Sequence, residues 1–333
     1  GFVGVGFNTV LGKRFSGGVE AGAHVLEALA GFREVTPAHN PAYAACIRCF
    51  AEKLPKVPRV ALFETAFYQW ITPAAYSYAI PQAWRDLGIR RYGFHGASHK
   101  FVAERSAEIL GNGIIVDRVR NLYTTGPGEY SGAPLRVLSC HLGGSSSVTG
   151  IQNGVAIGTS MGFSPQSGLP QNNRVGDLDS MAIPYVCKML GLSIEEAERQ
   201  LNKESGLLGL SGVSNDARDI RDAAEQGNTD AVLATEVLID SIRHWAGSFF
   251  FKMGGAEAIV FTAGIGENDA ELRAAVCAGL EDLGVQIDPT ANAKAIRGVE
   301  GIISAPDSKI KVIVIPANEE LVIAREVFRK VSK

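Results

Sequence analysis

The stretch LSCHLGGSSSV, residues 138–148, places two glycines and three serines between two runs of strand-forming residues. It predicts a strand, a glycine-rich turn and a second strand. Because glycine permits positive φ and close approach to a ligand, the N–H groups of such a turn can converge on an anion. The serine hydroxyls add donors, so the expected guest is a phosphate. Taken alone, the same residues are more often an ordinary hairpin.

A second glycine-rich turn follows a later strand. The stretch FTAGIGEN, residues 261–268, ends a strand in glycines and leads into a helical segment. Phosphate and dinucleotide sites use this arrangement to let a ligand pack on the backbone. The stretch does not match G-x-G-x-x-G, and spacing assigns no acidic residue to a ribose. A nicotinamide-dependent dehydrogenase is therefore only weakly supported.

Short β-rich runs alternate with helical periodicity along the rest of the chain. This alternation predicts an α/β fold whose central sheets are covered by helices. The predicted strands are 57–63, 135–142, 148–151, 258–262 and 311–315, and the predicted helices are 40–53, 193–202, 229–253, 269–283 and 319–331. Residues 111–134 hold five glycines, two prolines and no clean period. A surface insertion, a hinge or a long loop is predicted there.

Length and composition exclude several classes of protein. The 333 residues, 46% hydrophobic and 20% charged, fit two domains with sizeable cores. A net charge of -3 without basic runs disfavours nucleic-acid binding. No membrane span or leader pattern is present, which predicts a cytoplasmic protein. The pair Cys46 and Cys49 is expected to be two ordinary buried thiols, with a zinc site as the less favoured alternative.

Histidines gather in glycine- and proline-rich turns. The stretch YGFHGASHK, residues 92–100, holds His95 and His99 just before a helical run, and His39 precedes the helix expected from Asn40. Turns of this kind often display functional side chains, although a lone histidine is more often structural. Metal ligation is disfavoured, because the HExxH spacing and thiolate partners are missing.

Two further stretches carry hydrogen-bonding side chains at expected helix starts. In SGVSNDARD, residues 211–219, the side chains could hold a base or ribose, or Ser214 or Asn215 could simply cap a helix. Glu319 and Glu320 follow a strand, where they could bind Mg²⁺ near a nucleotide or stabilise a helix N-terminus.

These stretches occur together in an order typical of one family. Over nearly its whole length the sequence resembles the acetate kinase family, on the motifs HNP at 39–41, FETAF at 63–67, YGFHGASHK at 92–100, HLG at 141–143, TSMGF at 159–163, SNDAR at 214–218, FTAGIGEN at 261–268 and NEE at 318–320. The resemblance implies a two-domain α/β fold of the sugar kinase, Hsp70 and actin-like (ribonuclease H-like) type. The expected domains are residues 1–67 with 321–333, a partial acyl-kinase domain, and the nucleotide-binding residues 68–320.

The same resemblance implies a reaction and its site. A homodimer would transfer the γ-phosphoryl group of ATP reversibly to a short-chain carboxylate, acetate above all, giving ADP and an acyl phosphate with Mg²⁺. Such a transfer needs cations and hydrogen-bond donors around the phosphoryl group. By motif matching, the catalytic residues would be His95, Arg174, Glu64 and His39, the metal ligand Glu319, and the substrate-binding residues Asn8, Phe94 and Pro165. The nucleotide would contact His141, Gly143, Gly144, Ser145, Asp216, Ala217, Arg218, Gly264, Ile265 and Asn268.

The sequence also departs from the family's pattern. Glu64 stands where the family has a catalytic aspartate, and a shift of about one ångström in a reacting group can cost about 100-fold in rate. Asn8 replaces the substrate-binding arginine, for which Lys13 or Arg14 could substitute electrostatically, although a lysine lacks the bidentate fork. The family's N-terminal strand, with its phosphate-contacting cluster, has no counterpart before Gly1. The alternative function is therefore a catalytically impaired, nucleotide-binding homologue with a scaffold or regulatory role.

Overall fold

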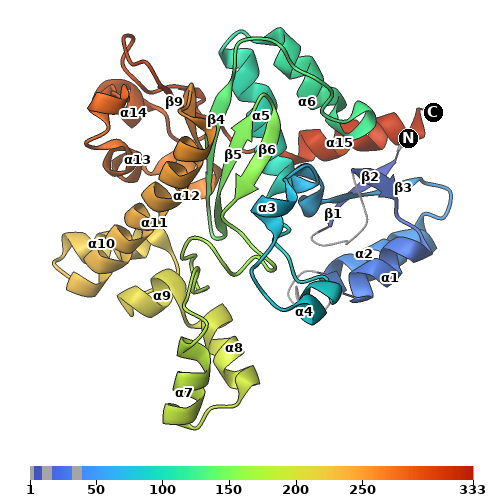
Figure 1. The fold of residues 1–333 in the computed structure, drawn as a ribbon, viewed down its shortest axis with the longest axis horizontal. Helices are drawn as coiled ribbons and strands as arrows, with labels where there is room; N and C mark the ends of the chain where they lie inside the picture. The colour runs from blue at the N-terminus through green and yellow to red at the C-terminus, as the bar shows by residue number, and fades with distance from the viewer. Residues whose placement is uncertain (1–3, 10–16, 32–39, 333) are drawn as a thin grey trace.

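The computed structural model describes residues 4–9, 17–31 and 40–332. They form two β-sheets, one of three strands and one of six, each packed against helices (Figure 1). The predicted α/β class is therefore confirmed.

The six-stranded sheet forms the centre of the molecule and has the order β6-β5-β4-β7-β9-β8. Strands β4, β7 and β9 are parallel, and β5 and β6 extend β4 as an antiparallel meander. The bounds are β4 Arg136–Leu142, β5 Ser146–Gln152, β6 Val155–Thr159, β7 Ala258–Thr262, β8 Gly301–Ile302 and β9 Lys311–Val314. The strands predicted in this region are confirmed, whereas β6 and β8 were not predicted.

Successive residues of the central strands face opposite sides of this sheet, as the period of a strand requires. Leu138 and Cys140 of β4 belong to a core that includes residues of α11 (Thr229–Met253) and α13 (Ala270–Cys277). Val137, the residue before Leu138, belongs to a second core with residues of α5 (Gly96–Ile109) and α6 (Gly113–Thr125). The sheet is thus buried on both faces, and polar turns are left at its edges.

The segment 111–134, predicted to be irregular, contains helix α6. Asn112 caps it, because its side chain accepts a hydrogen bond from the Ile115 N–H at 3.1 Å. Ile115, Val119 and Leu122 are buried at the spacing of one helix face. The prediction was wrong because the glycines and prolines flank the helix and do not interrupt its interior, apart from Gly113 at its first position.

Most other helices follow the local pattern. The predicted bounds of α2 (Asn40–Lys53), α11 and α15 (Glu319–Val331) are confirmed. Ser193 caps α8 (Ile194–Lys203) by accepting from the Glu196 N–H at 3.2 Å. The helix predicted over 269–283 is shorter, because Gly279 at φ +72° separates α13 from the 3-10 turn Glu281–Leu283. The remaining helices are α1 Ala23–Gly31, η1 Glu64–Tyr68, α3 Pro73–Tyr76, α4 Gln82–Asp86, α7 Ala182–Leu190, α9 Gly206–Ser211, α10 Ala217–Glu225, α12 Ala263–Asn268 and α14 Pro289–Lys294.

Cys46 and Cys49 are exposed, so the expectation of buried thiols was wrong. The two cysteines lie three residues apart on the outer face of α2, whereas Ala44 and Ile47 face the core. Within the described ranges, no group of three or more His, Cys, Asp or Glu side chains could hold a metal ion.

The smaller sheet has the order β1-β3-β2, formed by Val5–Thr9, Arg59–Phe63 and Gly18–Glu20. Helices α1 and α2 share a core with it, and α15 returns from the C-terminal end of the chain to pack against it. The approach of α15 is close, because a Cβ on Gly6 would lie 2.3 Å from a methyl carbon of Ile323. The domain division at 67/68 and 320/321 stays a prediction.

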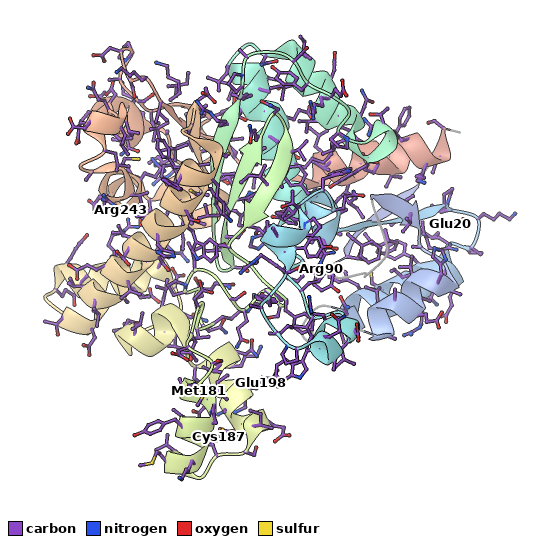
Figure 2. The ribbon with its side chains drawn as sticks, viewed as in Figure 1. Glu20, Arg90, Met181, Cys187, Glu198 and Arg243 are labelled. Carbon is purple, nitrogen blue, oxygen red and sulfur yellow. The ribbon has the colours of Figure 1, made fainter. Side chains whose placement is uncertain are left out.

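Helices α7 and α8 project from the body of the molecule (Figures 1 and 2). Met181, Tyr185 and Met189 are 69%, 65% and 61% exposed there. Among the helices that the structure describes, none is long and apolar enough to cross a membrane.

Candidate active site

The turn between β4 and β5 has the predicted strand–turn–strand form. Ser146 braces it, since its hydroxyl lies 3.2 Å from Gly143 N and 3.1 Å from Gly143 O. Ser145 donates a hydrogen bond to Gln171 Oε1 at 2.7 Å, and Arg174 donates to Ser145 Oγ at 3.3 Å. Arg174 makes no ion pair with an acid of the described chain, and burial lowers its pKa. A cation held without a counter-ion beside a glycine turn suits an anionic ligand.

A pocket of about 620 Å³ opens beside this turn. That volume is in the range of small-molecule sites. The structure brings together in it eight residues that the sequence assigned to nucleotide binding, namely Gly143, Gly144, Asp216, Ala217, Arg218, Gly264, Ile265 and Asn268. His141 and Ser145 flank the same turn but do not line the pocket.

We call this the nucleotide pocket, after the sequence assignment of its residues, and the start of α10 forms one of its walls. Asp216 is the N-cap, since it accepts a hydrogen bond from the Arg218 N–H at 2.9 Å. The cap expected at Ser214 or Asn215 was therefore misplaced. Ser214 instead accepts from the Asp216 N–H and donates to Asp219. Asp216 thus both caps the helix and lines the pocket, so the two alternatives for this stretch are not exclusive.

The start of α12 forms the opposite wall, at the carboxyl end of β7. A Cβ on Gly264 would meet no atom within 4 Å, so this backbone is open to a ligand. Asn268 donates to Gly264 O at 2.8 Å and accepts from the Arg297 N–H at 2.9 Å. This side chain ties the glycine turn to a loop 29 residues further along the chain.

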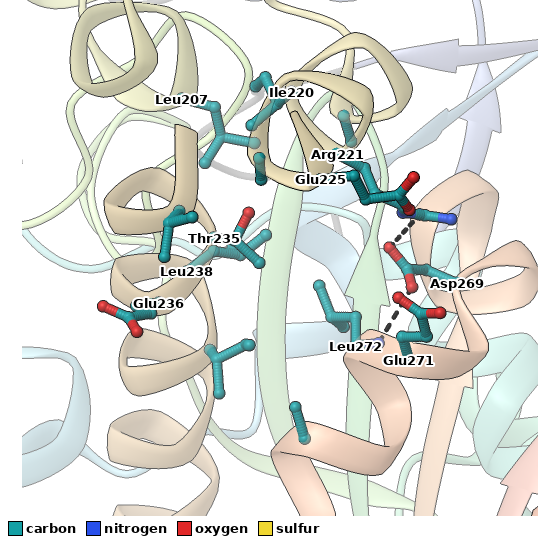
Figure 3. A pocket seen from close by; sticks show the side chains of 15 residues that line it. Leu207, Ile220, Arg221, Glu225, Thr235, Glu236, Leu238, Asp269, Glu271 and Leu272 are labelled. Carbon is teal, nitrogen blue, oxygen red and sulfur yellow. Dashed lines mark hydrogen bonds and ion pairs between the residues drawn. The ribbon is translucent and has the colours of Figure 1, made fainter. Parts of the chain in front are cut away.

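A second, largely apolar pocket of about 370 Å³ adjoins the first and lies between α10, α11 and α13. Figure 3 shows Ile220, Leu238 and Leu272 around it. An ion pair between Arg221 and Asp269 lines both pockets and forms the wall between them. Asp269 also caps α13 by accepting from the Leu272 N–H at 3.0 Å.

Sequence reasoning missed four residues of the nucleotide pocket: Asn172, Arg221, Asp269 and Arg297. Arg221 lies four residues after Ala217, one helical turn further along the same face of α10. Asp269 directly follows Asn268, so local spacing could have indicated both. Asn172 and Arg297 arrive from distant loops, for which the sequence carries no such signal.

Two carboxylates from distant parts of the chain share one amide donor. Asn8 of β1 donates hydrogen bonds to Glu64 and, at 3.3 Å, to Glu319 at the first position of α15. Glu64 also accepts from the Ala97 N–H at 3.2 Å. Gly96 permits this approach, because a Cβ there would lie 1.9 Å from the Glu64 carbonyl oxygen.

Burial perturbs this carboxylate pair. Desolvation raises the pKa of the Glu64 carboxyl, and burial together with the Glu64 charge raises the pKa of Glu319 to about 8. The side-chain oxygen of Asn8 is buried without a hydrogen-bond partner. Carboxylate and amide oxygens are the donors that Mg²⁺ prefers, and one or two carboxylates suffice where substrate phosphates complete its shell. The residues present therefore fit the metal that the family resemblance implies.

His95 lies between the carboxylate pair, Glu64 and Glu319, and the glycine-rich turn between β4 and β5, Gly143–Ser145. It stands directly before α5 with φ 64°, two residues from the amide that binds Glu64. Its ring stacks on His141, with centroids 4.0 Å apart, and His141 is two residues from Gly143. Burial lowers the pKa of His141 to about 4, so this neighbour is neutral.

Phe94 is buried in a small apolar cluster with Tyr92 and Met161, against which Tyr43 and Phe163 pack. Phe94 directly precedes His95, so this cluster adjoins the histidine.

Pro165, expected in the same wall as Phe94, is not part of that cluster. Its carbonyl accepts from Gln171 at 2.7 Å, which places it on the Arg174 side of the site. His39, Lys13 and Arg14 lie outside the described residues.

The two glycine-rich turns follow neighbouring parallel strands, with His141 in register with Thr262. Ligands of α/β sheets bind at such carboxyl ends, and the two-sheet architecture defines a nucleotide-binding protein of the actin-like class. The sequence model described as the Acetokinase family matches residues 3–325. The chain belongs to this family.

Individual relatives agree with this assignment. The chain is 44% identical over 328 residues to an acetate kinase of Geobacillus kaustophilus, covering 98% of this chain and 78% of the relative. Its structure matches an acetate kinase of Porphyromonas gingivalis with a TM-score of 0.87 and 36% identity, over 99% of this chain and 78% of that one. A propionate kinase of Francisella tularensis matches with a TM-score of 0.86 and 35% identity, over 97% and 78%. The predicted family and fold are confirmed.

Proposed function

We propose that the chain transfers the γ-phosphoryl group of ATP reversibly to a short-chain carboxylate, with acetate as the first candidate. The observation that carries this proposal is the position of His95, which stacks beside the glycine-rich turn and lies two residues from the amide that binds Glu64. The phosphate donor, held at the glycine-rich turn, and the acceptor carboxylate can meet beside His95. The names of the relatives, acetate kinase and propionate kinase, support the same reaction.

In this proposal the turn Gly143–Ser145 binds the phosphates of ATP or ADP through backbone N–H groups. The adenosine lies between the starts of α10 and α12, where the nucleotide pocket is lined by Asp216, Ala217, Arg218, Gly264, Ile265 and Asn268. Arg174 and His95 stabilise the charge of the transferring group, as preorganised donors do in phosphoryl transfer. His39, assigned by motif, would assist them.

Glu319 would hold Mg²⁺, with Glu64 behind it. When bound, the ion would neutralise charge on the phosphate oxygens. Asn8 keeps the two carboxylates together, and its unpartnered amide oxygen adds a donor atom. Phe94 and Pro165 would flank the acceptor, with the apolar cluster of Phe94 against the acyl group.

The longer side chain of Glu64 is matched by its surroundings. Asn8 and the Ala97 N–H both donate to its carboxylate. A shorter asparagine in place of the family's arginine leaves room for the longer glutamate. This pairing favours a working enzyme over an impaired homologue.

We also propose that the enzyme is a cytoplasmic homodimer, as the family resemblance implies. The exposed apolar side chains of α7 support a second copy of the chain as partner, because exposed patches of this kind mark protein interfaces.

The reaction is tested by ADP formation with ATP, Mg²⁺ and acetate, propionate or butyrate, with trapping of the acyl phosphate by hydroxylamine. Turnover with at least one acid is expected. Nucleotide binding without turnover on any of the three would refute the proposal and favour a nucleotide-binding scaffold.

A further inference from the structure

A chain of serine and histidine side chains runs from His95 into the large sheet. Ser147 Oγ lies 2.8 Å from His95 Nδ1 and 2.9 Å from His99 Nε2. The other nitrogen of His99, Nδ1, lies 2.7 Å from Ser139 Oγ. Ser139 comes from β4, Ser147 from β5 and the histidines from the start of α5, so the register of the sheet sets the spacing.

His99 is neutral in this chain. Its side chain is fully buried, and burial lowers its pKa well below the ordinary value. A neutral imidazole has one donor and one acceptor nitrogen. Because both nitrogens of His99 contact serine hydroxyls, one serine must donate to it and the other must accept from it.

The Ser147 hydroxyl has a single proton and lies between two ring nitrogens. It therefore donates to one histidine and accepts from the other. Only two arrangements of the whole chain satisfy these conditions. In the first, every bond points toward His95; in the second, every bond points toward Ser139.

The end of the chain distinguishes the two arrangements. Ser139 is fully buried, and its hydroxyl has no partner other than His99 among the described residues. If the bonds ran toward Ser139, its own proton would be buried without an acceptor, which is costly. If they run toward His95, Ser139 donates to His99 Nδ1, His99 Nε2–H donates to Ser147, and Ser147 donates to His95 Nδ1. Both serine hydroxyls and both nitrogens of His99 then have a hydrogen-bond partner.

We propose that Ser139, His99 and Ser147 are positioning residues that keep His95 Nδ1 as a hydrogen-bond acceptor, so that the ring carries its proton on Nε2. That nitrogen is the one directed away from Ser147. It presents a hydrogen-bond donor, and not a lone pair, to an anionic oxygen. The inference rests on the proposed function only for the role of His95 at the phosphoryl group.

The tautomer is measured directly by NMR on the full chain with ring-¹⁵N histidine, at a pH well above the ordinary histidine value of about 6.5. The His95 resonances are assigned by their loss in His95→Gln. In the wild type, His95 is expected to have an unprotonated Nδ1 and a protonated Nε2. In Ser147→Ala, His95 is expected to show either the opposite tautomer or a mixture of the two tautomers. A wild-type His95 protonated on Nδ1 would overturn the proposal.

Kinetics provide the second readout. Ser147→Ala should lower kcat about 10- to 100-fold, the usual cost of losing a partner that orients a site histidine, with KM for ATP and carboxylate nearly unchanged. Ser139→Ala removes the other end of the chain without touching His95 and should lower kcat less. Unchanged kcat and an unchanged His95 tautomer in both variants would refute the proposal that this serine–histidine relay, Ser139–His99–Ser147, positions His95.

The matched control is Ser106→Ala. Ser106 is a buried serine of α5 whose hydroxyl donates to Ala103 O at 3.4 Å, away from the site. It should change neither the tautomer nor kcat. Because the NMR measurement needs no turnover, it tests the relay even if the assays show that the proposed reaction is wrong.

Discussion

Glu64 is one methylene longer than the residue that the family pattern leads one to expect, and its carboxylate is held by donors on two sides. Asn8 and the Ala97 N–H both bind it. Shortening the side chain withdraws the carboxylate from both donors. The site is therefore tuned to glutamate in this chain, although the family uses aspartate.

We predict that Glu64→Asp lowers kcat/KM for the carboxylate by about 100-fold, the cost of misplacing a reacting group by about one ångström. The double variant Glu64→Asp with Asn8→Arg, which restores the family's pair, should be more active than Glu64→Asp alone. Steady-state kinetics of the two single variants and the double variant measure this coupling. A Glu64→Asp enzyme faster than the wild type would show that Glu64 is a defect.

Lys100 is 2% exposed, and its ammonium lies 5.0 Å from the centre of the Tyr123 ring. Burial lowers its pKa to about 8, against the opposing effect of Glu326 and Glu104. The unfolded value is about 10.4. Between these two values the unfolded chain binds more protons, so the free energy of unfolding should rise with pH from about 8 to about 10.4.

We predict that Lys100→Met removes this rise and makes the protein more stable than the wild type at pH 7. Urea unfolding at several pH values measures both effects. Equal pH slopes for the two proteins above pH 8 would contradict the prediction.

At the scale of elements, α10 and α13 meet through the Arg221–Asp269 wall. Removing Arg221 leaves the Asp269 carboxylate facing the nucleotide pocket, where its charge repels phosphates. We predict that Arg221→Ala raises KM for ATP about tenfold, which corresponds to about 1.4 kcal/mol, with a smaller change in kcat.

Asp269→Asn is the matched control for that prediction. It breaks the same ion pair, keeps an oxygen to cap α13 and leaves Arg221 unpaired. KM for ATP should stay the same or fall. If KM for ATP rose equally in both variants, the ion pair would affect ATP binding through the shape of the pocket wall and not through the charge of Asp269.

Elements whose signal is local could be predicted from the sequence. Helices α11 and α15 have a capping asparagine directly before their first residue, and α2, α11 and α15 have apolar residues at helical spacing. The turn at 143–145 is marked by its glycines and serine. Strands β1 and β2 gain their stability from contacts with distant residues, namely pairing with β3 and packing against helices, so no local pattern marks them. Helix α6 was hidden by glycines and prolines at its ends.

The candidate site divides in the same way. The gathering of eight motif residues around one pocket follows from the sequence, because the walls of that pocket are helix starts and turns that the motifs mark. The links between Asn8, Glu64 and Glu319, and the relay from Ser139 to His95, arise only when distant strands and helices meet. Spacing along the chain carries no information on such contacts.

At the scale of the whole molecule, the projection of α7 and α8 presents apolar side chains to solvent. We predict that the protein sediments as a dimer and that Tyr185→Glu shifts it toward the monomer, because a buried charge without a partner is costly at an interface. Glu198→Gln on the neighbouring helix α8 serves as a control that leaves the apolar side chains in place. A wild-type monomer, or a Tyr185→Glu dimer of unchanged affinity, would contradict this interface.

The hydrogen bond between Asn8 and Glu319 joins residues 311 positions apart. At about 5–20 residues per second, a ribosome adds the second partner roughly 15–60 s after the first. Until then the face of the small sheet that receives α15 is uncovered and the carboxylate pair is incomplete. A nascent chain can therefore form its nucleotide pocket before it can complete the carboxylate pair proposed to hold Mg²⁺. Completion of the active site therefore depends on α15, which is made after every other element that the structure describes.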